Sequence, residues 1–142
     1  MSSSLLLDTH IVLWLDSGSE RLHAETRALI DRCWLDEGEI FFSAVSAWEM
    51  AMLVDAERIT LDTPLPTWIG RFLSRPGMSA LPLAWSDAAR AYELHGIDSR
   101  DPADRLLVAQ AVGLACPLVT YDERIISFGR RFGARHGFRV AL

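Results

Sequence analysis

Four acidic side chains stand at positions where an unpaired charge is unfavourable. Asp8 and Asp122 each follow a short apolar run, and Glu49 and Asp104 each lie on an apolar stripe near the start of a predicted helix. Burying a carboxylate without a partner costs on the order of several kcal/mol. The four acids therefore need a cation or a metal ion.

The stretch 101–115 predicts a buried helix that carries Asp104. Pro102 suits the first helical position and Asp101 the N-cap, because proline lacks an N–H and aspartate accepts a free backbone N–H. The stretch is apolar nearly all round, which indicates burial against a sheet. Asp104 shares a stripe with three apolar side chains at i+3, i+4 and i+7 spacing. We expect Arg105 to pair with Asp101 at i, i+4.

A second helix, predicted from Ser43 to about Arg58, carries Glu49. Glu49 is the only charge between Glu39 and Asp55, and it shares a stripe with apolar side chains. Like Asp104, it is a carboxylate on the side of a helix that should face the core.

Short apolar runs alternate with helical patterns along the chain. Strands separated by helices favour βαβ units and a mostly parallel sheet with helices on both faces. The stretch 129–137 is interpreted as a basic loop. The predicted strands are 4–7, 40–42, 78–83, 118–120 and 138–142, and the predicted helices are 9–16, 20–36, 43–58, 68–73, 86–95, 102–115 and 122–128.

These elements would bring the four acids together. Asp8 and Asp122 end strands, and open α/β sheets bind ligands at the carboxyl ends of their strands. Glu49 and Asp104 lie in helices that begin at the same edge. Carboxylate oxygens select hard cations, so Mg²⁺ or Mn²⁺ is favoured over zinc. Such a site suits hydrolysis of a phosphate ester.

Each acid alone also has a structural interpretation that needs no metal. Ends of helices favour acidic side chains as caps and as partners of the helix dipole. These roles are an N-cap for Asp8, a capping box with Ser46 for Glu49, the positive helix end for Asp104, and a first-turn position for Asp122 beside a Thr120–Glu123 capping box.

Composition limits the class of protein. The chain has 142 residues, of which 50% are hydrophobic, so one domain with a substantial core is expected. All 14 basic residues are arginine, and the net charge is −5. A phosphate ligand would therefore depend on local arginines or bound cations. No membrane segment is evident, and the two separate cysteines are expected to be buried free thiols, which favours a cytosolic protein.

Four blocks together resemble the successive motifs of a known family. They are Leu6–Trp14, Ser43–Met50, Asp101–Ala111 and Leu118–Asp122. Their order and spacing look like those of PIN-domain ribonucleases, most closely the VapC toxins of bacterial toxin–antitoxin pairs. The resemblance spans essentially the whole chain, so residues 1–142 are expected to be one PIN domain. Ala103 departs from the pattern, because these toxins often have an aromatic residue there.

The resemblance implies a fold, an activity and partners. It implies a three-layer α/β/α fold with a mostly parallel central sheet of about four to five strands. It implies Mg²⁺- or Mn²⁺-dependent cleavage of RNA in the cytoplasm, frequent homodimers or hetero-oligomers, and neutralisation by a VapB-type antitoxin. Carried over residue by residue, it implies that the metal-binding catalytic acids are Asp8, Glu49, Asp104 and Asp122.

Other side chains have candidate supporting roles. Thr9, Asp101 and Thr120 are candidates to hold an acid or a metal-bound water. A structural role serves Thr9 equally well, and Asp101 is favoured as the helix cap and the partner of Arg105. Trp14 and Trp48 are expected in the core, with a groove for an antitoxin helix as the alternative. Candidate contacts to RNA phosphates, with a solvated surface as the alternative, are Arg100, Arg124, Arg130 and Arg131.

Particular residues argue against two rival enzyme-like families. A haloacid-dehalogenase-type enzyme needs a second aspartate where His10 stands, and a receiver domain needs a lysine, of which the chain has none. A housekeeping RNA-processing nuclease keeps the same chemistry. An inactive PIN-like scaffold is the alternative that is not an enzyme, and the presence of all four acids argues against it.

Overall fold

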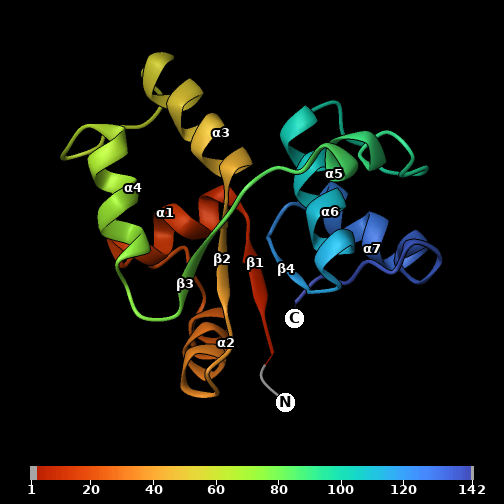
Figure 1. Cartoon of the computed structure of the whole chain (residues 1–142), viewed down its shortest axis with the longest axis horizontal. Helices are drawn as coiled ribbons and strands as arrows, with labels where there is room; N and C mark the ends of the chain where they lie inside the picture. Colours follow the sequence, from red (N-terminus) through yellow and green to blue (C-terminus); the bar gives the residue numbers. More distant parts are fainter. Residues whose placement is uncertain (1–2, 142) are drawn as a thin grey trace.

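The centre of the protein, known here from a computed structural model that describes residues 3–141, is a parallel sheet (Figure 1). Its strands lie in the order β3-β2-β1-β4, and every neighbouring pair is parallel. The strands are β1 (Leu5–Leu7), β2 (Ile40–Ser43), β3 (Met78–Leu81) and β4 (Leu118–Val119).

Helices cover both faces of the sheet, so the predicted three-layer α/β/α architecture is confirmed. One layer consists of α1 (Thr9–Ser17), α2 (Ala24–Leu35) and α4 (Leu65–Leu73). The opposite layer contains α6 (Pro102–Leu114) and α7 (Glu123–His136), with α5 (Trp85–Arg90) packed on α6. The remaining helix, α3 (Ala44–Asp55), contributes side chains to the hydrophobic cores on both faces.

Two hydrophobic cores lie on opposite faces of the sheet. In β1, Leu6 joins the core under α6 and α7, whereas Leu5 and Leu7 join the core under α1, α2 and α4. All three side chains are buried, because β1 has a strand on each side and helices on both faces. Such a strand reads as a continuous apolar run.

The helix α7 corrects two expectations. Residues 129–137 were expected to form a basic loop, but the helix continues to His136 and Gly137 caps it with a left-handed φ of 69°. Gly133 is buried, and a Cβ there would lie 2.6 Å from the carbonyl oxygen of Phe138. Only glycine fits at this close approach of the helix to the following chain. The predicted final strand is reduced to a bridge between Val140 and Leu118.

The helix α5 is shorter than expected. It begins at Trp85 after an N-cap at Ala84, not at Ser86, and ends at Arg90. The chain then turns, and carbonyls of this turn accept hydrogen bonds from the Arg105 side chain.

Two other expectations concern burial and membranes. Cys33 and Cys116 are both buried free thiols, as expected. Within residues 3–141, the search for helices long and apolar enough to cross a membrane found none.

Candidate active site

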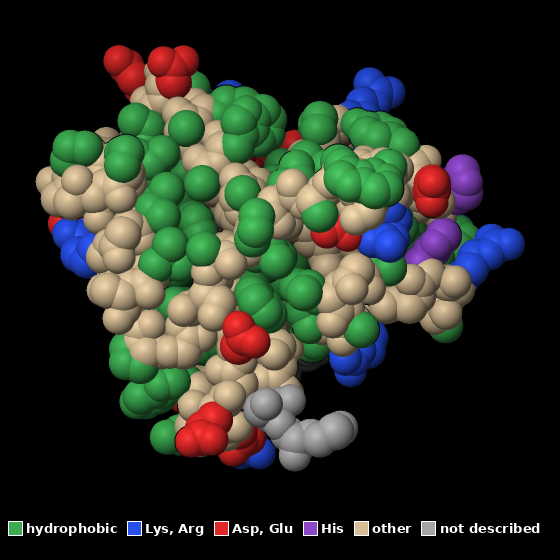
Figure 2. All heavy atoms as spheres, viewed as in Figure 1, with side chains coloured by type: hydrophobic (Ala, Val, Ile, Leu, Met, Phe, Trp, Pro, Cys, Tyr) green, Lys and Arg blue, Asp and Glu red, His purple; other side chains and the backbone are tan. Residues whose placement is uncertain are grey.

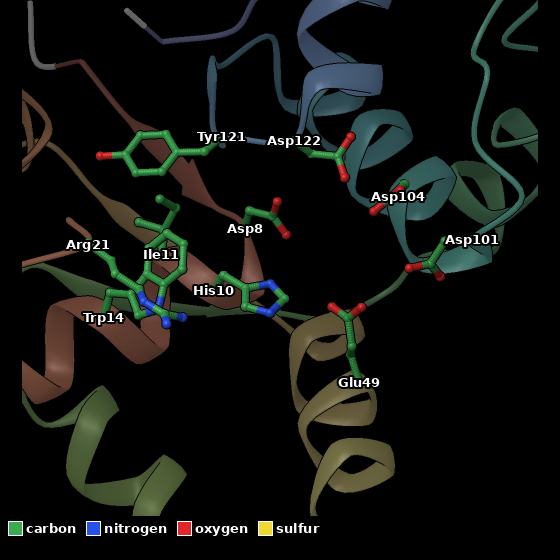
Figure 3. Close-up of a pocket in the computed structure, with 10 residues that line it drawn as sticks. All are labelled: Asp8, His10, Ile11, Trp14, Arg21, Glu49, Asp101, Asp104, Tyr121 and Asp122. Atoms are coloured by element: carbon green, nitrogen blue, oxygen red, sulfur yellow. The ribbon is translucent and has the colours of Figure 1, made fainter. Parts of the chain in front are cut away.

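The carboxyl ends of β1 and β4 open into a cleft of about 380 Å³ that is rich in carboxylates (Figure 3). Its lining includes Asp8, Glu49, Asp101, Asp104 and Asp122, and we call these five residues the acid wall. The structure therefore brings the four sequence-predicted acids to one place, together with Asp101.

Asp8 is the most tightly held member of the acid wall. It is 8% exposed and caps α1, and its Oδ1 accepts a hydrogen bond of 2.7 Å from the backbone N–H of Thr9. The buried Thr120 hydroxyl donates to Oδ2 over 2.6 Å. Burial raises the pKa of Asp8 and outweighs both hydrogen bonds. Asp8 is thus fixed in direction and favours a cation nearby.

Glu49 reaches the cleft from the second turn of α3. The Thr9 hydroxyl donates to Glu49 Oε1 and also lies 2.9 Å from the hydroxyl of Ser46, one turn earlier on α3. Burial raises the pKa of Glu49, and the hydrogen bond from Thr9 opposes this effect. The carboxylates of Asp8 and Asp101 raise it further. Thr9 therefore links α1 to the Glu49 carboxylate.

Asp104 projects from the first turn of α6. The hydroxyl of Ser99, which is 5% exposed, donates to its Oδ2 over 2.6 Å and accepts the Asp101 N–H at 3.2 Å. Burial raises the pKa of Asp104 to about 7, against the opposing effect of the Ser99 hydrogen bond. The carboxylates of Asp122, Asp101 and Asp8 raise it as well. Proton or cation binding at Asp104 thus relieves both desolvation and repulsion.

Asp101 and Asp122 are N-caps that also face the cleft. Asp101 accepts the Ala103 N–H at 3.0 Å, as predicted. Asp122 Oδ1 accepts the N–H groups of Arg124 and Ile125 at 2.9 and 3.2 Å. Each of these carboxylates therefore has a second oxygen that caps no backbone group, so capping and a role in the cleft are compatible.

The structural roles considered for the acids are partly observed. Asp8 and Asp122 do cap helices. The capping box expected for Glu49 and Ser46 is wrong, because Ser43 caps α3 by accepting the Val45 N–H at 2.9 Å.

The expected ion pair between Arg105 and Asp101 is also wrong. The Arg105 guanidinium lies over the ring of Tyr92, 5.0 Å from its centroid. It is 3.4–3.5 Å from the carbonyl oxygens of Ala91, Leu94 and Ile97, to which it donates. These carbonyl groups lie in the turns after α5 and need hydrogen-bond donors. By supplying them, Arg105 of α6 holds this segment against the helix.

The remaining sequence candidates lie outside the lining of the cleft or in unexpected surroundings. The described lining includes Arg21 but none of the four arginines predicted to contact RNA, which are all exposed: Arg100, Arg124, Arg130 and Arg131. Trp14 is partly buried and lines the cleft. The expectation that Trp48 packs in the core is wrong, because its position on α3 faces solvent and leaves it 51% exposed.

The donor set of the acid wall suits a hard divalent cation. It consists of carboxylate oxygens, and burial raises the pKa of three of the acids, so a positive charge would be favoured there. Among the residues that the structure describes, no three acidic, histidine or cysteine side chains are already arranged to hold an ion. The carboxylates line the walls of the cleft and would have to turn inward around one.

Sequence reasoning missed several residues that line or support the cleft. Ser99 is buried and holds Asp104, and its only signal was a position near a helix start, while Ser46 was considered only as a cap and instead contacts Thr9. Tyr121 lies next to Asp122 and was given no role, although it stands within the last of the four blocks that resemble the family. Arg21 gave no signal of its own, because it stands among the charges of the predicted helix 20–36, whereas α2 begins only at Ala24.

Comparison with known proteins agrees with this geometry. The family described as PIN domain matches residues 5–131. The chain is 31% identical to Ribonuclease VapC22 of Mycobacterium tuberculosis (strain ATCC 25618 / H37Rv) over 125 residues, which cover 88% of this chain and 92% of that protein. The fold of the present chain is similar to that of a chain in the crystal structure of VapBC2 from Rickettsia felis bound to a DNA fragment from their promoter. The TM-score is 0.66, the sequence identity is 13%, and 97% of both chains is covered. The chain therefore belongs to the PIN-domain family, within its VapC group.

Proposed function

We propose that the protein is a metal-dependent endoribonuclease that hydrolyses RNA phosphodiester bonds, and that the whole chain, 1–142, acts as one PIN domain. The observation that carries the proposal is the meeting of Asp8, Glu49, Asp104 and Asp122 in one cleft, although they come from separate elements. The name of the relative, Ribonuclease VapC22, supports the same activity.

Asp8, Glu49, Asp104 and Asp122 would hold Mg²⁺ or Mn²⁺. The chemistry that such an ion supplies when bound is neutralisation of charge on the phosphodiester and activation of water for attack. The acid wall alone would repel RNA, because phosphates and carboxylates carry the same sign of charge. Cleavage should therefore depend on the divalent cation.

Three hydroxyl groups prepare the carboxylates for this task. Thr120 fixes Asp8, Thr9 fixes Glu49 and Ser99 fixes Asp104, each through a hydrogen bond from its hydroxyl. Such outer partners orient metal ligands. At a greater distance from the reacting bond, the exposed arginines 100, 124, 130 and 131 would contact flanking phosphates.

We further propose that the protein is the toxin of a toxin–antitoxin pair and is neutralised by a VapB-type antitoxin in the cytoplasm. The VapBC2 assembly, whose chain shares this fold, supports such a partner. Hydrophobic side chains spread over the face that carries α3, β3 and α5 in Figure 2. Trp48 and Met52 of α3 and Trp85 of α5 are exposed. A protein partner or a second copy of the chain would cover such a face. The relative's name favours this role over housekeeping RNA processing.

The test is cleavage of total bacterial RNA by the purified, partner-free protein in Mg²⁺, Mn²⁺ or EDTA. An Asp104→Asn variant keeps the shape of the side chain and removes its charge. A matched control is Asp31→Asn, which makes the same change at an exposed site on α2.

We expect cuts at few sites with either metal, and no cuts in EDTA or with Asp104→Asn. The Asp31→Asn control should cleave like the unaltered protein. If the folded protein cuts no RNA in any metal, the nuclease proposal is wrong and a binding scaffold is the better description. If Asp104→Asn cuts equally well, Asp104 has no part in cleavage and the proposed catalytic site is wrong.

A further inference from the structure

Opposite the acid wall, the cleft is lined by rings and one cation. We call His10, Trp14 and Tyr121 the aromatic wall, and Arg21 lies beside it. Figure 3 shows four carboxylates of the acid wall on one side of the cleft and Trp14, Tyr121 and Arg21 on the other, with Asp8 and His10 between them. The proposed metal chemistry leaves these side chains without a task.

The rings form a continuous series that is fixed without any ligand. The His10 and Trp14 centroids are 5.7 Å apart, those of Trp14 and Tyr121 are 5.8 Å apart, and Tyr121 stacks on His23 at 4.6 Å. These spacings lie in the favourable range for aromatic pairs. The Tyr121 hydroxyl accepts the His23 backbone N–H at 3.0 Å and lies 2.6 Å from the hydroxyl of the buried Thr26. The aromatic wall is therefore held in place at its Tyr121 end.

The aromatic wall also borders a path out of the cleft. His10, Trp14 and Arg21 line a neighbouring cavity of about 700 Å³ as well, which extends to Arg58. A chain lying across the acid wall would thus pass Trp14 and Arg21 before it reached the second cavity.

Arg21 is available to a ligand. It is exposed, and it takes part in none of the three ion pairs found within residues 3–141. A guanidinium presents a planar set of N–H donors that matches a phosphate group. Its position across the cleft from the acid wall places a positive charge where an RNA backbone needs one.

We propose that the aromatic wall and Arg21 form a nucleotide subsite: an unpaired RNA base stacks on Trp14, and Arg21 binds the adjoining phosphate. The proposal rests on the nuclease function above and narrows the substrate to single-stranded RNA, since bases in a duplex are not free to stack on a side chain. Trp14 and Arg21 are then positioning residues that set which bond lies over the carboxylates.

The experiment measures binding and stacking separately from cleavage. Short single-stranded RNAs, each with 2-aminopurine at a different position, are titrated with protein in Mg²⁺. Every protein carries Asp104→Asn so that the RNA is not cut. Affinity comes from fluorescence anisotropy, and stacking comes from quenching of 2-aminopurine. The variants are Trp14→Leu, Trp14→Phe, Arg21→Gln and Arg21→Lys, with Trp85→Leu and Arg32→Gln as exposed controls outside the cleft.

We expect quenching at one position of the RNA. Trp14→Leu should abolish it and weaken binding by about 5- to 100-fold, the usual effect of losing one stacked base. Trp14→Phe should restore both, which a merely structural role for Trp14 would not predict. Arg21→Gln should weaken binding and reduce its salt dependence, and Arg21→Lys should retain part of both. In proteins with an intact Asp104, Trp14→Leu should raise KM by a larger factor than it lowers kcat.

Three results would overturn the subsite. One is unchanged quenching and affinity in a folded Trp14→Leu protein. Another is weaker binding in which Trp14→Phe behaves like Trp14→Leu and Arg21→Gln has no effect. A third is unchanged RNA binding with loss of a protein partner, which would make the aromatic wall a peptide-docking surface. Each differs from failure of the nuclease proposal, which shows itself as absence of cleavage by the folded, unaltered protein in any metal.

Discussion

The acid wall and the aromatic wall of the cleft are assembled in different ways. The acids come from the end of β1, from α3, from α6 and from the start of α7, so their meeting depends on the whole fold. Trp14 and His10 instead share α1, and Tyr121 directly precedes Asp122. Burial raises the pKa of carboxylates in the acid wall, whereas the rings of the aromatic wall stabilise one another. The carboxylates of the acid wall repel one another, and a bound cation would relieve this repulsion. The aromatic wall is stable without a ligand.

The largest effect should come from the acid wall at Asp8. Asp8→Asn keeps the helix cap but removes the charge, and we expect cleavage to fall by about a thousandfold or more, which is roughly 4 kcal/mol of barrier. KM should change little, because binding would depend on the opposite wall. Measured kcat and KM on a short RNA test this. A loss confined to KM would contradict the division of tasks between the walls.

The hydroxyl that supports Asp8 should matter less. Thr120→Val removes the hydrogen bond to Asp8 Oδ2 at nearly equal volume, and we expect a loss of about 10- to 100-fold in cleavage, as for other outer partners of metal ligands. Added to Asp8→Asn, the same change should cost little more, because the two groups act together. Fully additive losses in this double-mutant cycle would show that Thr120 acts elsewhere.

The Tyr121 hydroxyl of the aromatic wall should matter more for stability than for catalysis. Tyr121→Phe keeps the ring but leaves the His23 N–H and the buried Thr26 hydroxyl without their partner, and we expect unfolding to become easier by about 1–3 kcal/mol. Cleavage should stay within about threefold, since the ring remains. Urea unfolding and kcat measure the two effects. A large loss of cleavage at unchanged stability would place the Tyr121 hydroxyl in the reaction itself.

The smallest effect should be the pH dependence of stability without metal. The pKa of Asp104 is about 7 in the folded protein and 3.8 in a free side chain, so the folded state keeps a proton that the unfolded state loses. Stability should therefore fall as pH rises through this window. Asp104→Asn removes the effect and should raise Tm in EDTA by about 2–4 °C at pH 8, and by less at pH 5.

The control for this measurement is Asp31→Asn, which should leave Tm nearly unchanged at both values of pH. Added Mg²⁺ or Mn²⁺ should reverse the order and make the unaltered protein the more stable one, because it alone keeps the full set of carboxylates. A Tm difference that does not grow between pH 5 and pH 8 would show that Asp104 is not destabilising when charged.

Much of the acid wall was predictable from sequence because its signal is an anomaly. A carboxylate after an apolar strand, such as Asp8, or on an apolar stripe, such as Asp104, stands out against the pattern around it. The order of strands and helices was predictable for a related reason, since the buried strands are apolar runs. The family resemblance then identified four such acids as one set.

The remaining features depend on contacts between distant segments, which no local pattern shows. Arg105 binds carbonyls of the turns after α5 instead of Asp101. The stretch 129–136 is helical although it is rich in glycine and arginine, and it continues a helix whose Ile125 and Phe128 lie in the core. Trp48 is exposed although tryptophan favours burial. Ser99 and Arg21 gain their roles only when the chain folds around the cleft.

The strand order β3-β2-β1-β4 also has a consequence for the chain during its synthesis on the ribosome. Proteins emerge from their N-terminus at about 5–20 residues per second, and β1 can pair with β2 well before its other edge receives β4. Asp104 and Asp122 belong to that late segment. A nascent chain that lacks it carries at most half of the proposed catalytic acids. If the protein is a toxin, its proposed catalytic site is therefore complete only late in translation. This delay leaves time for a co-produced antitoxin to bind the chain.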